Sequence, residues 1–486
     1  MVAGRPGAPV NRSLPRTSAG TTKIEPTILS PTGVDLSLLD NDAVRATQRL
    51  IHRGFEAYLV GGCVRDLLLG RTPKDYDIAT QAHPQQVKRV FPRNCRIIGR
   101  RFKLAHLHFH GNTKILECST FRRTPQLESS EDVLITRDNE FGTAEEDALR
   151  RDFTVNALFL DPTRDEILDY VNGLQDVRDK VIRTIGDPIV RFREDPVRIL
   201  RAAKFAGRLG FTVEPDTLAA MSETSGDLVR SAPPRLIEEI LRLLRGGHSL
   251  DSFQLLRDVG AHKSLVPVLA DFLGTAPHEE RVAFWRLLDA LDRRVAEGAA
   301  FPNGVLLGAL LVCAVQAKAE RNPGRSVSSV AEDLLAPLCA SLRLPKRDAG
   351  CLKRICGVQH RFLQADEQRR FRTEGFLHGP YFFEALALFE LRTMANGGDL
   401  ALVDRWYDLA REVFPDGARQ DDGRDEAEGV RGGDDRGAEP ALAAEETSDE
   451  PVASAADDTS NPWAGPEPEG PGEPVENFGD VAIPQI

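Results

Sequence analysis

Two aspartates separated by one residue lie in the segment "YLVGGCVRDLLLGRTPKDYDIAT", residues 58–80. If residues 75–80 form a strand, Asp75 and Asp77 project from the same face, about 7 Å apart along the backbone. Two carboxylates this close repel each other unless a cation lies between them, and hard oxygen ligands suit Mg²⁺. The pair therefore predicts a magnesium site. The alternative is a surface hairpin with two solvated aspartates.

A glycine pair, Gly61 and Gly62, interrupts the apolar run that precedes these aspartates, and Arg65 follows it. Glycine lets the backbone turn or approach a ligand closely, and backbone N–H groups exposed in such a turn bind phosphate oxygens. A phosphate-binding loop followed by paired carboxylates indicates a nucleoside-triphosphate site with metal-assisted phosphoryl chemistry.

A second polar motif is "TAEEDALRRDFTVNALFLD", which begins at Thr143. A threonine followed three residues later by a glutamate forms a capping box, so a helix is expected to start here. Continued as a helix, the segment places Asp152 and Asn156 on one face, next to Arg150 and Arg151. Such a face could hold a ribose and a triphosphate; the alternative is the solvated side of an amphipathic helix.

A third motif is "REDPVRILRAAKFAGRLGF", residues 193–211. Pro196 suits a first helical turn with Asp195 as its N-cap, so that Asp195 and Arg198 could face one way. A carboxylate accepts from an exocyclic amine and a guanidinium donates to a ring nitrogen, an arrangement that fits adenine and cytosine but not guanine or uracil. The alternative is a capping aspartate with a local salt bridge.

Two further segments are rich in cations. "NCRIIGRRFKLAH" is expected to form a basic patch, or else a solvated loop, with Arg96, Arg100, Arg101 and Lys103. "QRRFRTEGFLHGPYFFEALALFELR" mixes arginines with aromatic residues, which suits single-stranded RNA unless the aromatics belong to the core. These aromatics are Phe371, Phe376, Tyr381, Phe382 and Phe383.

The elements that would position these residues change in type along the chain. Short β-rich runs dominate the first part, and Gly111-Asn112 is expected to form a hairpin turn. Strands are expected over residues 57–60, 75–80, 102–110 and 114–122, and helices over 40–52 and 64–69. From about residue 190 to 410, Leu and Ala recur at helical spacing, and residues 304–315 read as a buried helix. The pattern predicts an α+β fold with a small α/β head followed by a long α-helical body.

Charge is distributed unevenly over the 486 residues. From Asp416 to the end there are 20 acidic and 4 basic residues, so the net charge of −12 divides into −16 for this tail and +4 for residues 1–415. A mildly basic body is compatible with a polyanionic partner. The seven cysteines are scattered without a paired spacing, and no secretory signal is visible, so the cytoplasm is expected.

Shifts in composition predict a disordered N-terminal segment (1–35), a head (36–165), a long helical part (166–414) and an acidic disordered tail (415–486).

The segments "LVGGCVRDLLLGRTPKDYDIAT", "LRRDFTVNALF" and "EDPVRILRAAKFAGRLGF" occur in this order, and the combination resembles the class II nucleotidyltransferases of the polymerase-β-like superfamily. These are bacterial poly(A) polymerases and CCA-adding tRNA nucleotidyltransferases. The resemblance is strong over roughly residues 40–245 and weaker over 246–410. It implies a polymerase-β-like head that holds a small mixed sheet with helices, Mg²⁺ as cofactor, and ATP and RNA 3′ ends as partners. It also implies that the helical part divides into a neck with the base-reading helix (166–245) and a helical RNA-binding body (246–414). The RNA would be single-stranded RNA or tRNA; DNA and membranes are not expected.

The resemblance also implies roles for the motif residues. Asp75 and Asp77 would bind Mg²⁺, with Asp152 as a further catalytic carboxylate. The remaining matches would bind the nucleotide: Gly61, Gly62 and Arg65 the triphosphate, with Asp66 bracing their loop; Arg151, Asp152 and Asn156 the ribose and phosphates; and Asp195 and Arg198 the base, with Arg201 nearby. Glu117, in the apolar-acid-apolar setting of "KILECST", is the alternative third carboxylate.

The product is inferred from a different segment. "NCRIIGRRFKLAHLHF" resembles the corresponding segment of bacterial poly(A) polymerases, whereas CCA-adding relatives usually carry a shorter strand there. The expected activity is repeated AMP addition to RNA 3′ ends in RNA polyadenylation and mRNA processing. The alternatives are a CCA-adding or A-adding tRNA nucleotidyltransferase and, more distantly, an RNA-binding protein that kept the fold without catalysis.

Overall fold

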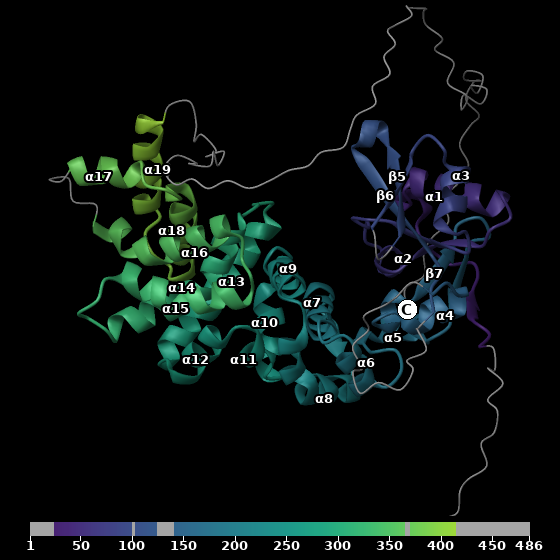
Figure 1. Ribbon diagram of the computed structural model, residues 1–486, viewed down its shortest axis with the longest axis horizontal. Helices are drawn as coiled ribbons and strands as arrows, with labels where there is room; N and C mark the ends of the chain where they lie inside the picture. Colours follow the sequence, from purple (N-terminus) through teal and green to yellow (C-terminus); the bar gives the residue numbers. More distant parts are fainter. Residues whose placement is uncertain (1–23, 100–102, 124–139, 365–369, 415–486) are drawn as a thin grey trace, which may run out of the picture. The chain divides into compact units, whose positions relative to one another are not determined.

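The computed structural model describes residues 24–99, 103–123, 140–364 and 370–414 (Figure 1). The first part of the chain forms a mixed α/β head, and the rest is almost entirely helical, as the sequence predicts. The expected acidic tail, residues 415–486, and the first 23 residues lie outside the described part of the chain.

An eight-stranded sheet is the framework of the head. Its strands are β1 (Thr27–Leu29), β2 (Ala57–Val60), β3 (Asp77–Thr80), β4 (Cys95–Ile98), β5 (Leu104–Phe109), β6 (Lys114–Thr120), β7 (Leu158–Asp161) and β8 (Glu166–Asp169). They lie in the order β1-β8-β7-β2-β3-β6-β5-β4. Only the β3–β6 pair is parallel, so the sheet is mixed, and the expected β5–β6 hairpin turns at Gly111 and Asn112.

One face of the sheet is packed against helices. Alternation along each strand turns residues such as Ile78, Leu107 and Leu116 into the core, where they meet α1 (Asn41–His52) and α3 (Pro84–Val90). The opposite face of β3, β6, β5 and β4 carries polar side chains toward water. The head also contains α2 (Gly62–Leu68) and α4 (Ala144–Arg150).

After β8 the chain is helical apart from the two-stranded pair β9 (Val181–Ile182) and β10 (Thr212–Val213). The first helices are α5 (Gly173–Asp179), α6 (Pro188–Glu194), α7 (Arg198–Leu209), α8 (Pro215–Thr224) and α9 (Pro233–Leu244). The later ones are α10 (Ser249–Asp258), α11 (Ala261–Leu265), α12 (Pro267–Thr275), α13 (His278–Ala296), α14 (Asn303–Glu320), α15 (Val327–Ser341), α16 (Lys346–Val358), α17 (Arg370–Leu377), α18 (Phe382–Ala395) and α19 (Ala401–Val413). Prolines and glycines mark several helix borders: Pro233 and Pro267 start helices, and Gly298 lies between α13 and α14.

Among the described helices, α14 alone has the length and apolar composition of a membrane span. However, 72% of it is buried within the protein, where it contacts α13, α15, α16 and α18. It is therefore a central core helix, as residues 304–315 predict.

The borders of the head differ from the sequence-based expectation. Residues 1–35 were expected to be disordered, but Thr27–Leu29 form β1, which pairs antiparallel with β8. The strand exposes Ile28, and its pairing depends on backbone hydrogen bonds and on Thr32 donating to Asp165 at 2.5 Å, which composition does not reveal. Because β8 ends at Asp169, the sheet also extends past the expected border at residue 165.

Candidate active site

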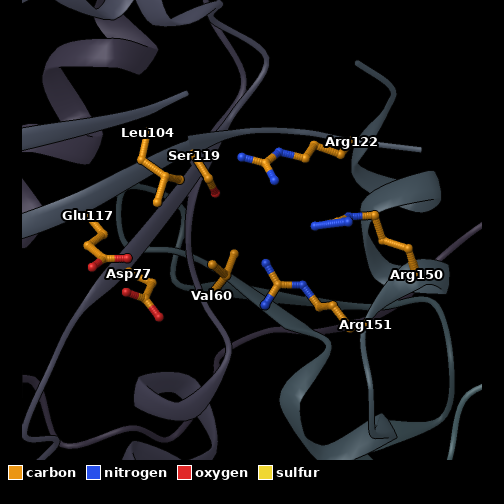
Figure 2. Close-up of a pocket in the computed structure, with 8 residues that line it drawn as sticks. All are labelled: Val60, Asp77, Leu104, Glu117, Ser119, Arg122, Arg150 and Arg151. Atoms are coloured by element: carbon orange, nitrogen blue, oxygen red, sulfur yellow. The ribbon is translucent and has the colours of Figure 1, made fainter. Parts of the chain in front are cut away.

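Two carboxylates and three guanidinium groups face each other across one pocket of the head, as Figure 2 shows. Asp77 and Glu117 lie on one side, and Arg122, Arg150 and Arg151 lie on the other. The pocket has a volume of about 180 Å³ and is completed by Val60, Leu104 and Ser119. Opposed anionic and cationic walls suit a ligand that carries phosphates and a metal ion.

Strand pairing brings the two carboxylates together. β3 and β6 run parallel in a register that sets Asp77 beside Glu117. Partial desolvation within the pocket, together with Glu117 and Asp75, raises the pKa of Asp77 to about 6, although the residue keeps an exposed surface and Arg151 acts in the opposite direction. Removal from water and the two neighbouring carboxylates both disfavour the charged form of Asp77, and a cation bound beside it would favour that form.

Asp75 lies just before β3, because the strand begins at Asp77 rather than at Asp75 as expected. Side chains still alternate here: Asp75 and Asp77 are exposed and Tyr76 between them is buried, so the two aspartates share a face. Asp75 does not line the pocket of Figure 2, but it is close enough to affect the pKa of Asp77.

These oxygen donors fit Mg²⁺, which usually keeps several waters and takes only one or two protein carboxylates together with substrate phosphates. Among the described residues, no three Asp, Glu, His or Cys side chains already converge as a preformed cage. The carboxylates therefore provide only part of the coordination of a metal ion, and the substrate phosphates and water would provide the rest.

Buried Asp147 on α4 anchors the cationic wall. Its carboxylate accepts from Arg151 at 2.9 Å, from Arg150 at 3.4 Å and from the backbone N–H of Arg122 at 3.1 Å. The capping box at Thr143, predicted from the sequence, starts this helix. Sequence reasoning missed Arg122 and gave Arg150 only a neighbouring place, because the contact between the end of β6 and α4 is not local in sequence.

Arg65, which is expected to bind the triphosphate, does not line the pocket of Figure 2. It is 1% exposed, and its guanidinium donates to Asp66 and to the side chain of Asn156. Asp66 also accepts from Arg208 of α7 at 2.9 Å, so these residues join α2 to α7. Gly61 has a φ of +79°, and a Cβ added there would lie 3.2 Å from Nη1 of Arg151, so this glycine leaves room for the cationic wall.

Asp152 and Asn156 contact each other, although the helix between them was wrongly expected. α4 ends at Arg150 because Arg151 is extended, and Asn156 lies in a separate short turn. Asn156 donates to Asp152 at 3.3 Å, and Arg201 of α7 donates to Asp152 at 2.7 Å. Burial favours a higher pKa for Asp152, but Arg201 and these hydrogen bonds hold it at about 2. Asp152 does not line the pocket with Asp77.

Asp195 occupies the turn between α6 and α7 instead of capping a helix that contains Arg198. Its Oδ2 accepts from Arg235 of α9 at 2.8 Å, and its buried Oδ1 has no hydrogen-bond partner among the described residues. Arg198 is held by Glu194 at 3.1 Å and by the carbonyl of Arg191 at 2.8 Å. Asp195 and Arg198 therefore do not share a helix face as expected. Asp195 lies in a turn, and its Oδ1 accepts no hydrogen bond from the described residues.

Arg191 connects this turn to the pocket. Its guanidinium donates to the backbone carbonyls of Arg150 and Arg151 at 2.7 and 2.6 Å, and to Glu194 at 2.7 Å. The segment that presents the pocket arginines and the turn that carries Asp195 are thus joined by one buried side chain.

The expected RNA-binding aromatics belong mainly to the core. Phe376 and Phe382 are buried and pack around Phe362 and Trp406. The side chain of Phe371 lies outside the described part, as do Arg100 and Arg101 of the basic patch, whereas Arg96 on β4 is exposed.

Comparison with known proteins matches this geometry to a family. Residues 57–183 match the family described as poly A polymerase head domain, and residues 210–273 match the probable RNA and SrmB-binding site of polymerase A. Poly(A) polymerase I of Haemophilus influenzae is 33% identical over 80% of this chain and 89% of its own length. Poly(A) polymerase I of Salmonella typhi is 36% identical over 76% and 82%.

CCA-adding enzymes are also similar. That of Geobacillus stearothermophilus is 36% identical over 46% of this chain and 54% of its own length. A solved tRNA nucleotidyltransferase with a primer tRNA and an ATP analogue has a TM-score of 0.53 at 24% identity, covering 76% of this chain and 99% of that one. This likeness shows the nucleotidyltransferase fold, and the identity and coverage of the polymerase I sequences show that the chain belongs to the poly(A) polymerase family of nucleotidyltransferases.

Proposed function

We propose that this protein transfers AMP from ATP to the 3′-hydroxyl of RNA repeatedly, with release of pyrophosphate. The observation that carries the proposal is the pocket in which Asp77 and Glu117 face Arg122, Arg150 and Arg151. Such a pocket provides both things that nucleotidyl transfer needs: a wall for the phosphates and a wall for cations and the attacking hydroxyl.

On the cationic wall, Arg151 and Arg150 would bind the β- and γ-phosphates, with Arg122 beside them. Their positions are set in advance by Asp147 and by the carbonyl contacts of Arg191, so little ordering is needed when ATP binds. Guanidinium groups held in place before the reaction stabilise charge as it moves onto the leaving pyrophosphate.

On the acidic wall, we assign Asp75, Asp77 and Glu117 as the residues that would hold Mg²⁺. The ion, when bound, would activate the attacking hydroxyl and neutralise phosphate charge. Glu117 is preferred to Asp152 as the third carboxylate because it is the register partner of Asp77, whereas Asp152 is paired with Arg201 outside the pocket. Asp152 and Asn156 would instead shape the ribose side of the site.

Base selection would depend on Asp195 and Arg198. The unused Oδ1 of Asp195 can accept from the exocyclic amine of adenine, and Nη2 and Nε of Arg198 make no hydrogen bond within the described residues. Guanine and uracil present a carbonyl and an N–H at these positions, so they would leave the Asp195 oxygen unpaired.

The experiment that tests the proposal supplies the purified protein with Mg²⁺ and with ATP or CTP separately. The acceptors are a generic RNA and a tRNA that lacks its CCA end. A long A-tract on both acceptors and poor CTP use are expected. Addition that stops after C-C-A, on tRNA only, would instead identify the CCA-adding activity, which the similarity to the Geobacillus enzyme makes the second candidate.

The seven cysteines are all free thiols, and six of them are buried. This pattern suits a reducing compartment, and we propose the cytoplasm as the place of action.

A further inference from the structure

The acidic wall of the pocket continues across the sheet in one row of register partners. Val60, Asp77 and Glu117 are followed by His106 on β5 and Arg96 on β4. Neighbours in such a row project to the same face, and strands lie about 4.8 Å apart, so Arg96 begins about 10 Å from Glu117. Val60 is buried, whereas Asp77, Glu117 and Arg96 are exposed and His106 is partly exposed, so the row faces water from Asp77 outward.

The side chains of this row change from acidic to basic with distance from the pocket. The imidazole of His106 is 18% exposed; its Nε2 is itself buried, lies 3.7 Å from Glu117 and has no hydrogen-bond partner among the described residues. Within the same described part, no carboxylate lies within ion-pair distance of Arg96. Exposed apolar side chains flank the row, with Ile98 39% exposed on one side and Ile115 48% exposed on the other. This surface combines a guanidinium and an imidazole, two of the groups that bind the phosphates and bases of single-stranded RNA, with apolar side chains beside them.

The positions of the attacking and leaving oxygens in the reaction indicate which ligand binds to this surface. In nucleotidyl transfer the attacking oxygen and the leaving oxygen lie on opposite sides of the phosphorus. The leaving pyrophosphate belongs to the wall of Arg122, Arg150 and Arg151, and Figure 2 shows Asp77, Glu117 and Leu104 of β5 on the side away from them. The attacking strand must therefore approach from the side where β6 and β5 continue.

We propose that the outer face of β6, β5 and β4 is the binding track for the 3′-terminal nucleotides of the RNA acceptor. Arg96 contacts a backbone phosphate that precedes the terminal nucleotide, His106 contacts the terminal nucleotide beside Glu117, and Ile98 and Ile115 contact bases or riboses. This inference rests on the proposed function, since it concerns the acceptor of the same reaction.

Replacement of Arg96 tests the track. Arg96→Ala is compared with Arg164→Ala, which removes one charge from an exposed side chain at the β7–β8 turn, on the other side of the sheet order. Arg96→Ala is expected to raise the KM for an oligonucleotide about tenfold and to reduce the slope of log KM against log salt by about 0.7, the value for one phosphate contact on a single strand. The KM for ATP should stay within twofold of the unmodified protein, and Arg164→Ala should change none of these quantities.

A second measurement identifies which phosphate of the RNA contacts Arg96. Oligonucleotides carry one neutral methylphosphonate linkage at each of the last three positions in turn. At one position the unmodified protein should lose affinity while Arg96→Ala loses none, because the partner charge is already absent. Equal losses at every position, or an RNA KM and salt slope that match Arg164→Ala, would overturn the track. Failure of the unmodified protein to extend any RNA would contradict the proposed function instead.

Discussion

Asp147 illustrates how one buried carboxylate sets a whole wall of the site. It is 4% exposed and accepts from Arg122, Arg150 and Arg151. A carboxylate this deeply buried is tolerated because its oxygens are satisfied by cations and backbone N–H groups. The guanidinium groups of Arg150 and Arg151 are thereby held beside the pocket before any ligand binds, and the backbone of Arg122 is fixed next to them.

Replacing Glu117 with its neutral amide distinguishes a catalytic role of this carboxylate from a structural one. Glu117→Gln, like Asp77→Asn, should lower AMP incorporation by at least about a hundredfold, because a charged oxygen on the acidic wall is lost. The melting temperature should not fall, since removing one of two neighbouring carboxylates relieves repulsion. Glu56→Gln, at an exposed glutamate before β2, is the control and should keep full activity. Near-normal incorporation by Glu117→Gln would remove Glu117 from the site.

Replacement of Asp152 is expected to lower the stability of the protein, in contrast to replacement of Glu117. Its ion pair with Arg201 is partly buried, with side-chain exposures of 10% and 34%. Asp152→Asn is expected to lower the free energy of unfolding by about 2 kcal/mol, less than for a fully buried pair because Arg201 reaches water. The pKa of Asp152 is lowered to about 2 in the folded protein, so this contribution is present above the unfolded pKa of about 4 and is lost as the pH falls toward 2.

Urea unfolding between about pH 3 and pH 7 measures this contribution. The difference between Asp152→Asn and the unmodified protein should be constant from about pH 5 upward and should shrink below about pH 4. Asp271→Asn, at an exposed position of α12, should show no difference at any pH. A difference that grows on acidification would contradict the assigned ion pair.

At the scale of elements, the α6–α7 turn, α9 and the end of α4 act as one assembly. Arg235 of α9 holds Asp195, and Arg191 of α6 reaches the carbonyls that follow α4. The turn proposed to select the base is therefore joined through direct hydrogen bonds to the segment that presents the pocket arginines. Substitutions in α9, which supports the turn, should therefore alter nucleotide selectivity although the substituted side chains do not contact the nucleotide.

Nucleotide competition tests this coupling. Asp195→Ala should lower the ratio of kcat/KM for ATP to that for GTP by at least about tenfold, because the acceptor that rejects guanine is lost. Arg235→Ala should lower the same ratio by a smaller factor. Arg242→Ala is the control, as its side chain is 50% exposed on the same helix and pairs with Glu238 and Glu239. Unchanged selectivity in Asp195→Ala would mean that the turn does not read the base.

At the scale of the whole molecule, charge is divided between two parts of the chain. Residues 1–415 carry a net charge of +4, and the segment from Asp416 carries −16. An acidic segment on the same chain competes with RNA for a basic surface, most strongly when salt does not screen it. The tail is thus expected to weaken RNA binding.

Truncation after Phe414 tests the effect of the tail. The cut keeps Phe414, whose ring contacts His378 and Phe383, so the melting temperature should not change. RNA affinity at low salt should be equal or higher, and the difference should disappear as salt is raised. A clear loss of affinity on truncation would show that the tail contributes to binding.

The sequence by itself determined the element types and the local motifs. The capping box at Thr143, the hairpin at Gly111-Asn112 and the buried α14 follow from interactions among residues close in sequence, which is why they could be predicted. Asp75 and Asp77 were placed on one face by strand alternation alone. The weakly apolar β1 was missed because its pairing with β8 joins segments far apart in sequence.

Only the tertiary structure decided which of these residues meet. The parallel register of β3 and β6 brings Glu117 to Asp77, and the packing of α2 against α7 takes Arg65 into the core. Asp147 gathers Arg122 to the other two arginines, and Arg235 reaches Asp195 from a separate helix. Register and helix packing depend on contacts summed over the whole core, and spacing along the chain carries no direct record of them.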